Sequence, residues 1–501
     1  MLLPALCITL VALLAVYYTR IPPDFPRSMP IIPLTIVIWD AIRGTSRVDF
    51  YNKRIRTLIQ KHGAVGIWQD GEWTILVVRP AYLVQLLKDP NDTFMKSGSY
   101  HRISTSGAAQ LFGENIIDSH GDLHDQFQRL LKPAIQRPFT LDGMKIESTR
   151  LVRAILQQQE SREDGSAVDI SALVWRWAVS IYGDYFLDVR LDELEYHTAA
   201  IQQIVGRQGR HAIGRMRRIF PFLDLLPWKW PAVEELFKNI HNLETALLGC
   251  IDCRLQTAHS PTDDDKVIYR LSQALEQNQI SDFHYRSNIK QLFVAGHENV
   301  ESTVSASLVE LAKNQGIQHA LHLEIKALPY HYSSHDLDQL PLLTAVVYET
   351  LRLYPPLGTL TNRRATKPTW LGPDLCIPAG ILVGWHAYGV QTDPLIWGPN
   401  AREFDPYRWG CSIRSVNERF RMYQVKGKYI PFSLYSRKCL GVKFAITQIK
   451  VGLVELSRRL VWRFPTDHRF SYSKVRSDNC YSIELYHTDE LKGSPNLSRK
   501  L

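Results

Sequence analysis

The sequence predicts a mainly helical body with minor β-sheets, preceded by an apolar N-terminal segment. Apolar residues recur at helical spacing over long stretches, whereas the β-prone stretches are short. The helical stretches are residues 172–186, 232–256, 289–311, 342–353 and 443–460; the β-prone ones are 66–68, 73–78, 375–383 and the C-terminal region. The length of 501 residues alone suggests about three domains, but no shift in composition marks a boundary. We therefore expect one large fold.

Residues 2–18 are uncharged and mostly apolar, which predicts a transmembrane helix. As a helix they would span ~26 Å, just short of a ~30 Å hydrocarbon core. A cleaved signal peptide is the alternative, but no Lys or Arg precedes the segment and it ends in Tyr17 and Tyr18. Arg20 and Arg27 follow it, so the positive-inside rule places the rest of the chain in the cytosol.

A proline-rich stretch, residues 19–36, follows the predicted anchor and favours stiff, extended chain. We expect a spacer there and a body that extends over residues 37–501. The seven cysteines are irregularly spaced, which argues against a disulfide framework and for a reducing compartment.

The net charge of +9 favours anionic partners. Basic residues and aromatics mix in residues 207–231, but the apolar part is one continuous block, 219–231, rather than spaced stacking platforms. This pattern favours contact with membrane lipid and argues against nucleic acid. A buried helix junction is the alternative.

Cys439 is the strongest candidate for a metal-binding residue. It lies just before a helical run that begins at Val442, where the positive end of a helix lowers the pKa of a thiol. Arg437 adds positive charge, Gly441 allows the backbone to pass close beneath a flat ligand, and Phe432 is placed to cover the sulfur. The alternative is a buried structural cysteine at a helix start.

The segment around Cys439 resembles the haem-binding signature of the cytochrome P450 family, FxxGxRxCxG. Phe432, Arg437, Cys439 and Gly441 match this signature, and Tyr435 stands where the family has glycine. The resemblance implies the cytochrome P450 fold, with haem b held between two helices and Cys439 as the axial ligand of its iron. It implies the membrane-anchored, microsomal type found in eukaryotes, with fungal relatives.

Glu349 and Arg352 are spaced to share one face of an apolar, and therefore buried, helix. A buried ion pair needs further hydrogen bonds, which Arg408 in the segment 404–409 can supply. These two segments resemble the ExxR and FxPxRW motifs of the family. The resemblance implies that the three residues form a structural triad that supports the haem side.

The resemblance also implies which residues bind the two haem propionates. These are Arg437, Arg363 and His124. His124 begins a segment similar to the family's histidine–arginine helix, but Gln128 stands at the arginine position, with Arg129 beside it as the available cation.

The segment Ala295–Gly296–His297–Glu298–Asn299 resembles the oxygen-activation motif AGx(D/E)T of the family. The resemblance implies that Gly296 opens a groove for dioxygen and that Glu298 holds water for proton delivery. Asn299 replaces the threonine, and asparagine does not relay a proton as simply as a hydroxyl does. Two chemistries stay open: an oxygenase with a modified relay, and an isomerase or dehydratase that rearranges a peroxide without external electrons.

We expect the substrate pocket to contain Phe293, Ala295, Leu357, Thr359 and Leu360. These residues are mostly apolar, which indicates a lipophilic small-molecule substrate. The hexapeptide that starts at Ala295 is similar to that of fungal relatives that act on modified tyrosines.

The resemblance implies a monooxygenase that takes electrons from NADPH through NADPH–cytochrome P450 reductase. It further implies an endoplasmic reticulum anchor, a cytosolic catalytic domain and a role in secondary-metabolite biosynthesis. Basic residues around the cysteine, namely Arg437, Lys438, Lys443 and Lys450, are candidates for docking the reductase. A non-catalytic haem protein is the third alternative.

Overall fold

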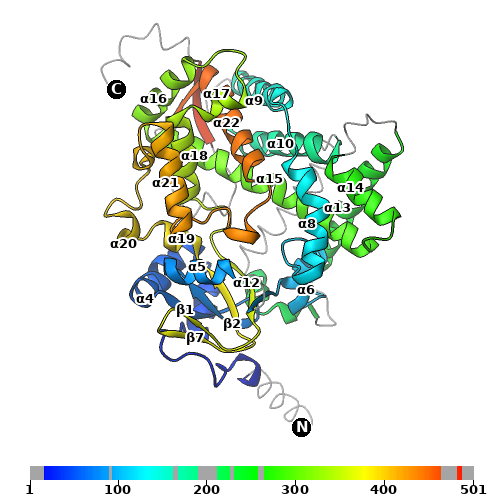
Figure 1. Cartoon of the computed structure of the whole chain (residues 1–501), viewed down its shortest axis with the longest axis vertical. Helices are drawn as coiled ribbons and strands as arrows, with labels where there is room; N and C mark the ends of the chain where they lie inside the picture. Colours follow the sequence, from blue (N-terminus) through cyan, green and yellow to red (C-terminus); the bar gives the residue numbers. More distant parts are fainter. Residues whose placement is uncertain are drawn as a thin grey trace.

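The computed structural model describes residues 16–89, 93–161, 168–189, 212–225, 231–257, 265–463 and 482–487. Helices make up most of this part of the chain, and most of the β-strands gather at one end of it (Figure 1). The prediction of a mainly helical fold with small sheets is therefore confirmed.

The α-helices are α2 (Leu34–Arg43), α3 (Arg47–Phe50), α4 (Arg56–His62), α5 (Pro80–Lys88), α6 (Ser99–Arg102), α7 (Gly107–Phe112), α8 (Gly121–Gln136), α9 (Asp142–Glu160), α10 (Ser171–Tyr182), α12 (Ala212–Ile219), α13 (Pro231–Leu255), α14 (Val267–Glu276), α15 (Asp282–Lys313), α16 (Gln315–Lys326), α17 (Ser334–Asp338), α18 (Pro341–Leu353), α19 (Ala387–Gln391), α20 (Pro394–Trp397), α21 (Ile413–Val425) and α22 (Val442–Arg459). Shorter turns of 3-10 or π helix are η1 (Tyr51–Ile55), η2 (Gly183–Leu187), η4 (Pro221–Leu225), η6 (Pro406–Trp409) and η7 (Tyr435–Arg437). The strands are β1 (Ala64–Gln69), β2 (Glu72–Val77), β3 (Phe94–Lys96), β4 (Val168–Asp169), β5 (Leu360–Ala365), β6 (Thr369–Leu371), β7 (Leu375–Ile377), β8 (Leu382–Trp385), β9 (Leu460–Arg463) and β10 (Ser482–His487).

Each of the five predicted helical stretches is a helix, and α15 is the longest at 32 residues. Its start is set by Ser281, whose side chain accepts a hydrogen bond from the backbone N–H of His284 at 3.2 Å. α15 crosses the middle of the helical part and packs against α10, α18 and α22 (Figure 1). The candidate site is built around this helix.

The main sheet has the strand order β1-β2-β8-β5-β3. Its hairpin β1–β2 turns through Asp70 and Gly71, both with positive φ (51° and 88°). An Asp-Gly pair with two positive φ angles suits the tight two-residue hairpin turn. β2 runs parallel to β8, and β8 continues antiparallel to β5, which places β5 next to β3. This order brings Arg363 of β5 opposite Lys96 of β3.

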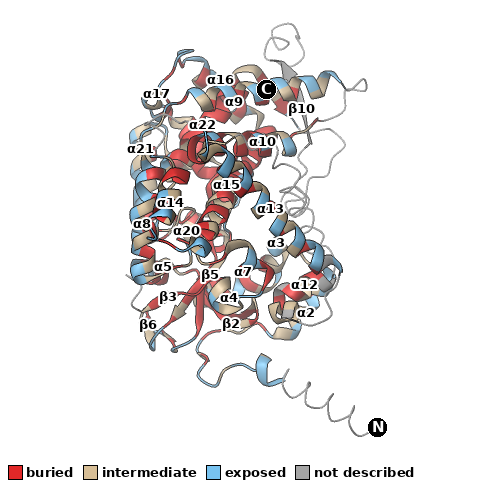
Figure 2. Ribbon diagram, turned by 90° about the vertical axis from the view of Figure 1, so that its right-hand side faces the viewer, coloured by how far each residue is buried: buried red, intermediate tan, exposed pale blue. Residues whose placement is uncertain are grey.

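Buried side chains form two hydrophobic cores, one within the helices and one around the main sheet (Figure 2). Part of the predicted spacer belongs to the second core, because Phe25, Met29 and Ile32 are buried there. The N–H of Ile32 donates to the carbonyl of Gly66 at 2.8 Å, so this chain segment packs along β1. α2 already begins at Leu34, inside the predicted spacer.

The predicted anchor, residues 2–18, lies outside the described residues except for residues 16–18. Within the described part of the chain, no helix combines the length and apolar character needed to cross a bilayer. The basic and aromatic segment 207–231 is described only over residues 212–225. There α12 packs against α2, and Arg215 donates to the carbonyl of Ile42 at 2.9 Å.

Candidate functional site

Cys439 lies in the short connection between η7 and α22. Its N–H donates to the carbonyl of Phe432 at 2.9 Å, which closes the loop over these two residues, and its side chain keeps accessible surface. Burial within the molecule raises the pKa of the Cys439 thiol, although the N–H of Gly441 and the charge of Lys438 lower it. The prediction that the helix start and Arg437 favour the thiolate stays a prediction, with desolvation acting against it. Binding to a metal ion would remove the proton, since a coordinating thiol is deprotonated outright.

Gly441 has open space above it. A Cβ atom there would meet only Cγ2 of Ile135, at 4.0 Å, and the φ angle of −88° is ordinary for any residue. Neither the backbone nor the neighbouring side chains demand glycine at this position. The open space leaves room for a flat ligand close to the backbone, and the loop therefore fits haem.

The turn before Cys439 is preserved despite the loss of its expected glycine. Tyr435 and Ser433 both have a φ of +56°, in the left-handed region that glycine usually occupies. A tyrosine held there costs about 1–2 kcal/mol relative to ordinary helical backbone. The departure from the family signature thus adds backbone strain without changing the turn.

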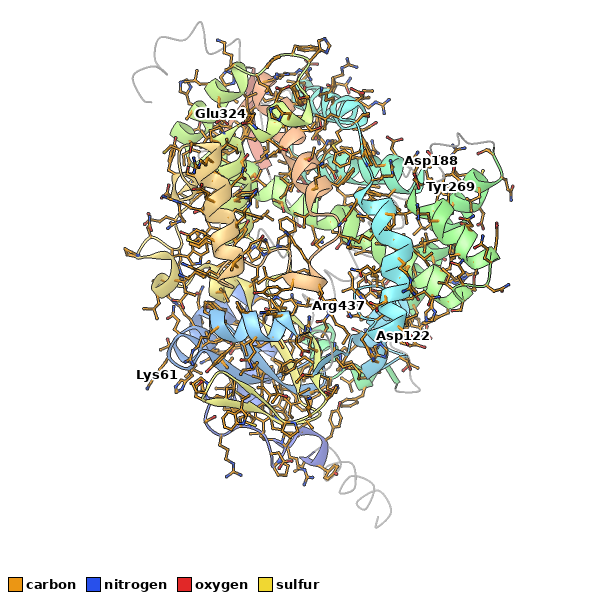
Figure 3. All side chains as sticks on the ribbon, viewed as in Figure 1. Lys61, Asp122, Asp188, Tyr269, Glu324 and Arg437 are labelled. Carbon is orange, nitrogen blue, oxygen red and sulfur yellow. The ribbon has the colours of Figure 1, made fainter. Side chains whose placement is uncertain are left out.

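Three cations meet beside the cysteine loop: the buried Lys96 and Arg363, and the partly buried Arg437. Arg437 reaches the chain just before α8, where its Nη2 donates to the carbonyl of Ser119 at 2.9 Å (Figure 3). Its Nε and Nη1 are buried and have no hydrogen-bond partner among the described residues, and the same holds for Nε and Nη2 of Arg363. Burial and mutual repulsion lower the pKa of Arg437 to about 10 and that of Lys96 well below its ordinary value; burial lowers that of Arg363 to about 10. Unpaired buried guanidinium groups indicate an anionic ligand.

The cluster offers free donor groups to a carboxylate ligand. Its cations are Lys96, Arg363 and Arg437, and the acids that act on them include Asp118 and Asp125 near Arg437 and Asp89 near Arg363. Asp118 is held by Asn362, whose Nδ2 donates to it at 3.1 Å. The cluster therefore fits the two propionates of haem. The sequence prediction included Arg363 and Arg437 but missed Lys96, because only the pairing of β3 with β5 brings it there.

His124 also borders the cluster, and Arg129 does not. His124 is buried on α8, where burial first and the charge of Arg437 second lower its pKa to about 4. It is therefore neutral at physiological pH and offers a hydrogen bond rather than a charge. Arg129 is exposed, because it lies one residue past the face that His124 shares with Gln128.

Glu349 and Arg352 form a bidentate pair at the end of α18. Nε and Nη2 of Arg352 donate to the two carboxylate oxygens at 2.8 and 2.7 Å, and neither residue is exposed. Arg408 adds a hydrogen bond at 3.3 Å and Trp409 one at 3.0 Å. The structure thus brings the three triad residues together, and Trp409 completes the set around the Glu349 carboxylate.

One face of α15 carries Ala295, Glu298 and Asn299, none of which is fully buried by protein. Nδ2 of Asn299 donates to the carbonyl of Ala295 at 3.2 Å, which leaves its side-chain oxygen available as an acceptor. Desolvation raises the pKa of Glu298 to about 7, and no hydrogen bond to its carboxyl is seen among the described residues. An acid that is half protonated near neutral pH can both give and take a proton.

Gly296 packs against α10. A Cβ atom at Gly296 would overlap the ring of Tyr182 in α10, so the glycine admits this ring. Gly296 and Asn299 are three residues apart and share one side of the helix, and the role of Gly296 in opening a groove for dioxygen stays a prediction. Phe293 lies on a buried side of α15, with no exposed surface and its ring 4.7 Å from that of His297. It therefore supports the helix rather than lining the predicted pocket.

The other predicted pocket residues keep accessible surface. Ala295, Thr359 and Leu360 are partly exposed, and Leu357 is 51% exposed. Three of these four side chains are apolar, as expected for a lipophilic substrate.

One residue of the predicted reductase-docking surface is not accessible to a partner. Lys450 is buried, and its ammonium lies 3.1 Å from the carboxylate of Asp338. Lys438 and Lys443 are exposed. Lys443 and Lys450 are seven residues apart on α22, but that helix is buried from Thr447 to Ser457.

Comparison with known proteins agrees with this geometry. The cytochrome P450 family profile matches residues 31–475. The chain is 35% identical to the cytochrome P450 monooxygenase xanG of Aspergillus fumigatus over 467 residues, which cover 92% of this chain and 86% of that protein. It is 30% identical to cytochrome P450-DIT2 of Saccharomyces cerevisiae, over 92% of this chain and 93% of that protein. It is 25% identical to human cytochrome P450 4F3, over 78% and 76% of the two chains. The chain belongs to the cytochrome P450 family and is a cytochrome P450 monooxygenase.

Proposed function

We propose that this monooxygenase oxidises a lipophilic small molecule, using electrons that NADPH supplies through a flavoprotein reductase. The observation that carries the proposal is the pairing of Cys439 with the buried cation cluster of Lys96, Arg363 and Arg437. Cys439 would ligate the iron of haem b and the cluster would hold its propionates. The thiolate-ligated haem supplies oxygen activation when bound.

The chain's own residues contribute positioning and proton handling. The triad around Glu349 anchors the end of α18 to η6. Glu298 holds a proton at its carboxyl near neutral pH, and the side-chain oxygen of Asn299 accepts a hydrogen bond from water or substrate. Ala295, Leu357 and Leu360 offer an apolar surface to the substrate.

The experiment is reconstitution of the full chain with haem, a fungal NADPH–cytochrome P450 reductase and ¹⁸O₂. Lipophilic candidates, including tyrosine derivatives, are supplied and the products are analysed by mass spectrometry. The proposal expects one ¹⁸O atom in a product, or NADPH-dependent oxidation of a substrate. Cys439→Ser is the matched control and should abolish both the reaction and the Soret band typical of the reduced carbon monoxide complex. A wild-type spectrum in that variant contradicts the assignment of the ligand.

A second candidate function is rearrangement of a peroxide without external electrons. Asn299 and Val300 favour it, because both hydroxyl positions of the family motif are replaced. Turnover of an organic hydroperoxide in the absence of reductase and NADPH would support it, and failure of that reaction would leave the oxygenase.

We further propose that the protein sits on the endoplasmic reticulum membrane, with residues 2–18 as a single-pass anchor and the catalytic domain in the cytosol. Tyr17 and Trp39 are 64% and 50% exposed, and each stacks with an arginine, Arg20 and Arg43. Aromatic and basic side chains together suit the interface between lipid and water. Deletion of residues 1–20 should move the protein from the microsomal pellet to the supernatant.

We also propose a role in secondary-metabolite biosynthesis, which the family resemblance of the sequence implies; two fungal cytochromes P450 match the chain over most of their length. Comparing metabolites from strains with and without the active protein tests this role. An unchanged metabolite profile would contradict it.

A further inference from the structure

A third arginine has buried donor groups like those of the two arginines in the propionate cluster. Arg102 is the last residue of α6, and its side chain is only 9% exposed. Its Nε and Nη1 are buried and have no hydrogen-bond partner among the described residues. In the described part of the chain, only Arg363 and Arg437 share this pattern of two such nitrogen atoms. A buried guanidinium whose donors lack acceptors indicates an anionic ligand.

The carboxylate of Asp70 does not satisfy these donors. Asp70 lies at the turn of the β1–β2 hairpin, and its Oδ2 is 3.8 Å from Nη1 of Arg102, which is beyond hydrogen-bonding distance. The Asp70 side chain is also 41% exposed, so water screens its charge. Asp70 therefore balances part of the charge of Arg102 and leaves the buried donors without an acceptor.

Arg102 is separate from the propionate cluster. The charges that shift the pKa values of the three cations in that cluster come from the cluster itself and from Asp89, Asp118 and Asp125. Arg102 is not among them. Since the cluster fits both propionates of one haem, the ligand of Arg102 is a different anion.

The hairpin connects Arg102 to the predicted substrate pocket. Nε2 of Gln69 donates to Oδ2 of Asp70 at 3.5 Å and to Oγ1 of Thr361 at 3.4 Å. Thr361 lies in β5, directly after the predicted pocket residue Leu360. The donors of Arg102 are thus next to a hydrogen-bonded chain that ends beside the pocket.

The helix that carries Arg102 is also held to α15. Nε2 of His101 lies 3.2 Å from one carboxylate oxygen of Glu114, and Nε2 of His284 in α15 lies 3.4 Å from the other. The rings of Tyr100 and Phe283 pack 5.0 Å apart between the same two helices. α6 is therefore fixed between the hairpin and α15, which places the guanidinium before any ligand binds.

We propose that Arg102 binds a carboxylate group of the substrate, so that the substrate is a lipophilic acid. The apolar surface at Ala295, Leu357 and Leu360 holds the lipophilic part, and the acid end lies toward α6. A neutral analogue is rejected because it leaves the buried donors of Arg102 unpaired. This inference rests on the proposed function, since it assigns a substrate class to the same pocket.

Spectral titration of the ferric, haem-loaded full chain compares acids with their methyl esters at neutral pH, where the acids are ionised. The probes are dodecanoic acid and 3-phenylpropionic acid, and binding is measured from the shift of the Soret band. We expect at least one acid to bind about 10- to 100-fold more tightly than its ester, as a charge-assisted hydrogen bond allows. Arg102→Gln should abolish this preference and Arg102→Lys should retain part of it. Arg414→Gln, which changes an exposed arginine of α21, is the control and should retain all of it.

A stability measurement tests the same arginine without any probe. Arg102→Met removes a buried cation whose donors lack acceptors, so the urea midpoint of unfolding of the ligand-free protein should rise. A lower midpoint would show that Arg102 has a structural partner and would overturn the proposal.

The titration can also fail in two distinguishable ways. Equal binding of acid and ester in both pairs, or an unchanged preference in Arg102→Gln, contradicts the role of Arg102, and oxidation of neutral lipophilic molecules would then leave the proposed function standing. Preferential binding of an acid by a protein that oxidises nothing with reductase and NADPH contradicts the proposed function and leaves the carboxylate site.

Discussion

The ring of Tyr182 in α10 occupies the space that a side chain at Gly296 in α15 would need. Gly296→Ala should therefore lower the free energy of unfolding by about 1–3 kcal/mol, the usual cost of overpacking. Chemical denaturation measures this. Gly249→Ala is the control: it lies within α13 with nothing within 4 Å of the added methyl, and should stabilise by about 0.5–1 kcal/mol. Equal changes in the free energy of unfolding for the two substitutions would contradict the packing of Tyr182 against Gly296.

Glu349 carries the buried triad, so its charge should matter for stability. Glu349→Gln leaves Arg352 and Arg408 facing a neutral amide inside the protein, which should cost about 3–5 kcal/mol. Urea denaturation and haem content are the measurements. Glu418→Gln removes the carboxylate of an exposed pair with Arg414 and should change neither. If Glu349→Gln lowered the free energy of unfolding only slightly, the triad would not act as a buried ion pair.

Lys96 should have opposite effects on the haem-free and haem-loaded protein. Lys96→Met removes a buried cation that is repelled by Arg363 and Arg437, so the haem-free protein should gain about 1–3 kcal/mol. The loaded protein should release haem faster, because one charge of the propionate site is gone. Transfer to a haem scavenger measures the release, and the exposed Lys443→Met serves as the control. An unaltered rate of haem release in Lys96→Met would contradict the assignment of Lys96 to the propionate site.

His297 should make the protein sensitive to acid. Burial lowers its pKa to about 4 in the folded protein, whereas an unfolded histidine titrates near ~6.5. Between these pH values the unfolded chain binds the extra proton, so stability is full above pH ~6.5 and falls as the pH drops toward 4, by up to about 3 kcal/mol. His297→Gln should flatten this dependence and the exposed His331→Gln should not, as followed by thermal unfolding from pH 4 to 7. If stability depended on pH in the same way in wild type and in both variants, His297 would not be the source of the acid sensitivity.

Tyr435 is strained, and glycine should relieve it. With φ at +56° and 40% of its surface exposed, Tyr435 contributes little packing, so Tyr435→Gly should stabilise by about 1 kcal/mol. Tyr407→Gly removes an equally exposed tyrosine that does not have positive φ and should destabilise. Differential scanning calorimetry of both variants is the measurement. Destabilisation by Tyr435→Gly would show that the tyrosine makes contacts that outweigh its strain.

Local patterns in the sequence were enough to predict much of the site. The spacing of Glu349 and Arg352 on one helix follows from residues that are close along the chain, and so does the position of Cys439 three residues before the start of α22. Arg363 and Arg437 were predicted from family motifs, and both lie in the cation cluster.

Other parts of the site depend on which helix face meets which neighbour. Lys96 enters the cluster through strand pairing, Lys450 is buried against Asp338, and Arg129 points outward. None of these outcomes is visible in a residue's local surroundings.

The sequence alone determined the helical fold class and the triad, and it identified Cys439 as the candidate ligand, because these depend on spacing along single elements. Only the tertiary structure decided that the ring of Tyr182 fills the space beside Gly296 and that Lys450 is buried against Asp338. The physical reason is that spacing sets which side chains share a face of a helix, whereas the packing of separate helices sets what that face contacts and how far it is removed from water.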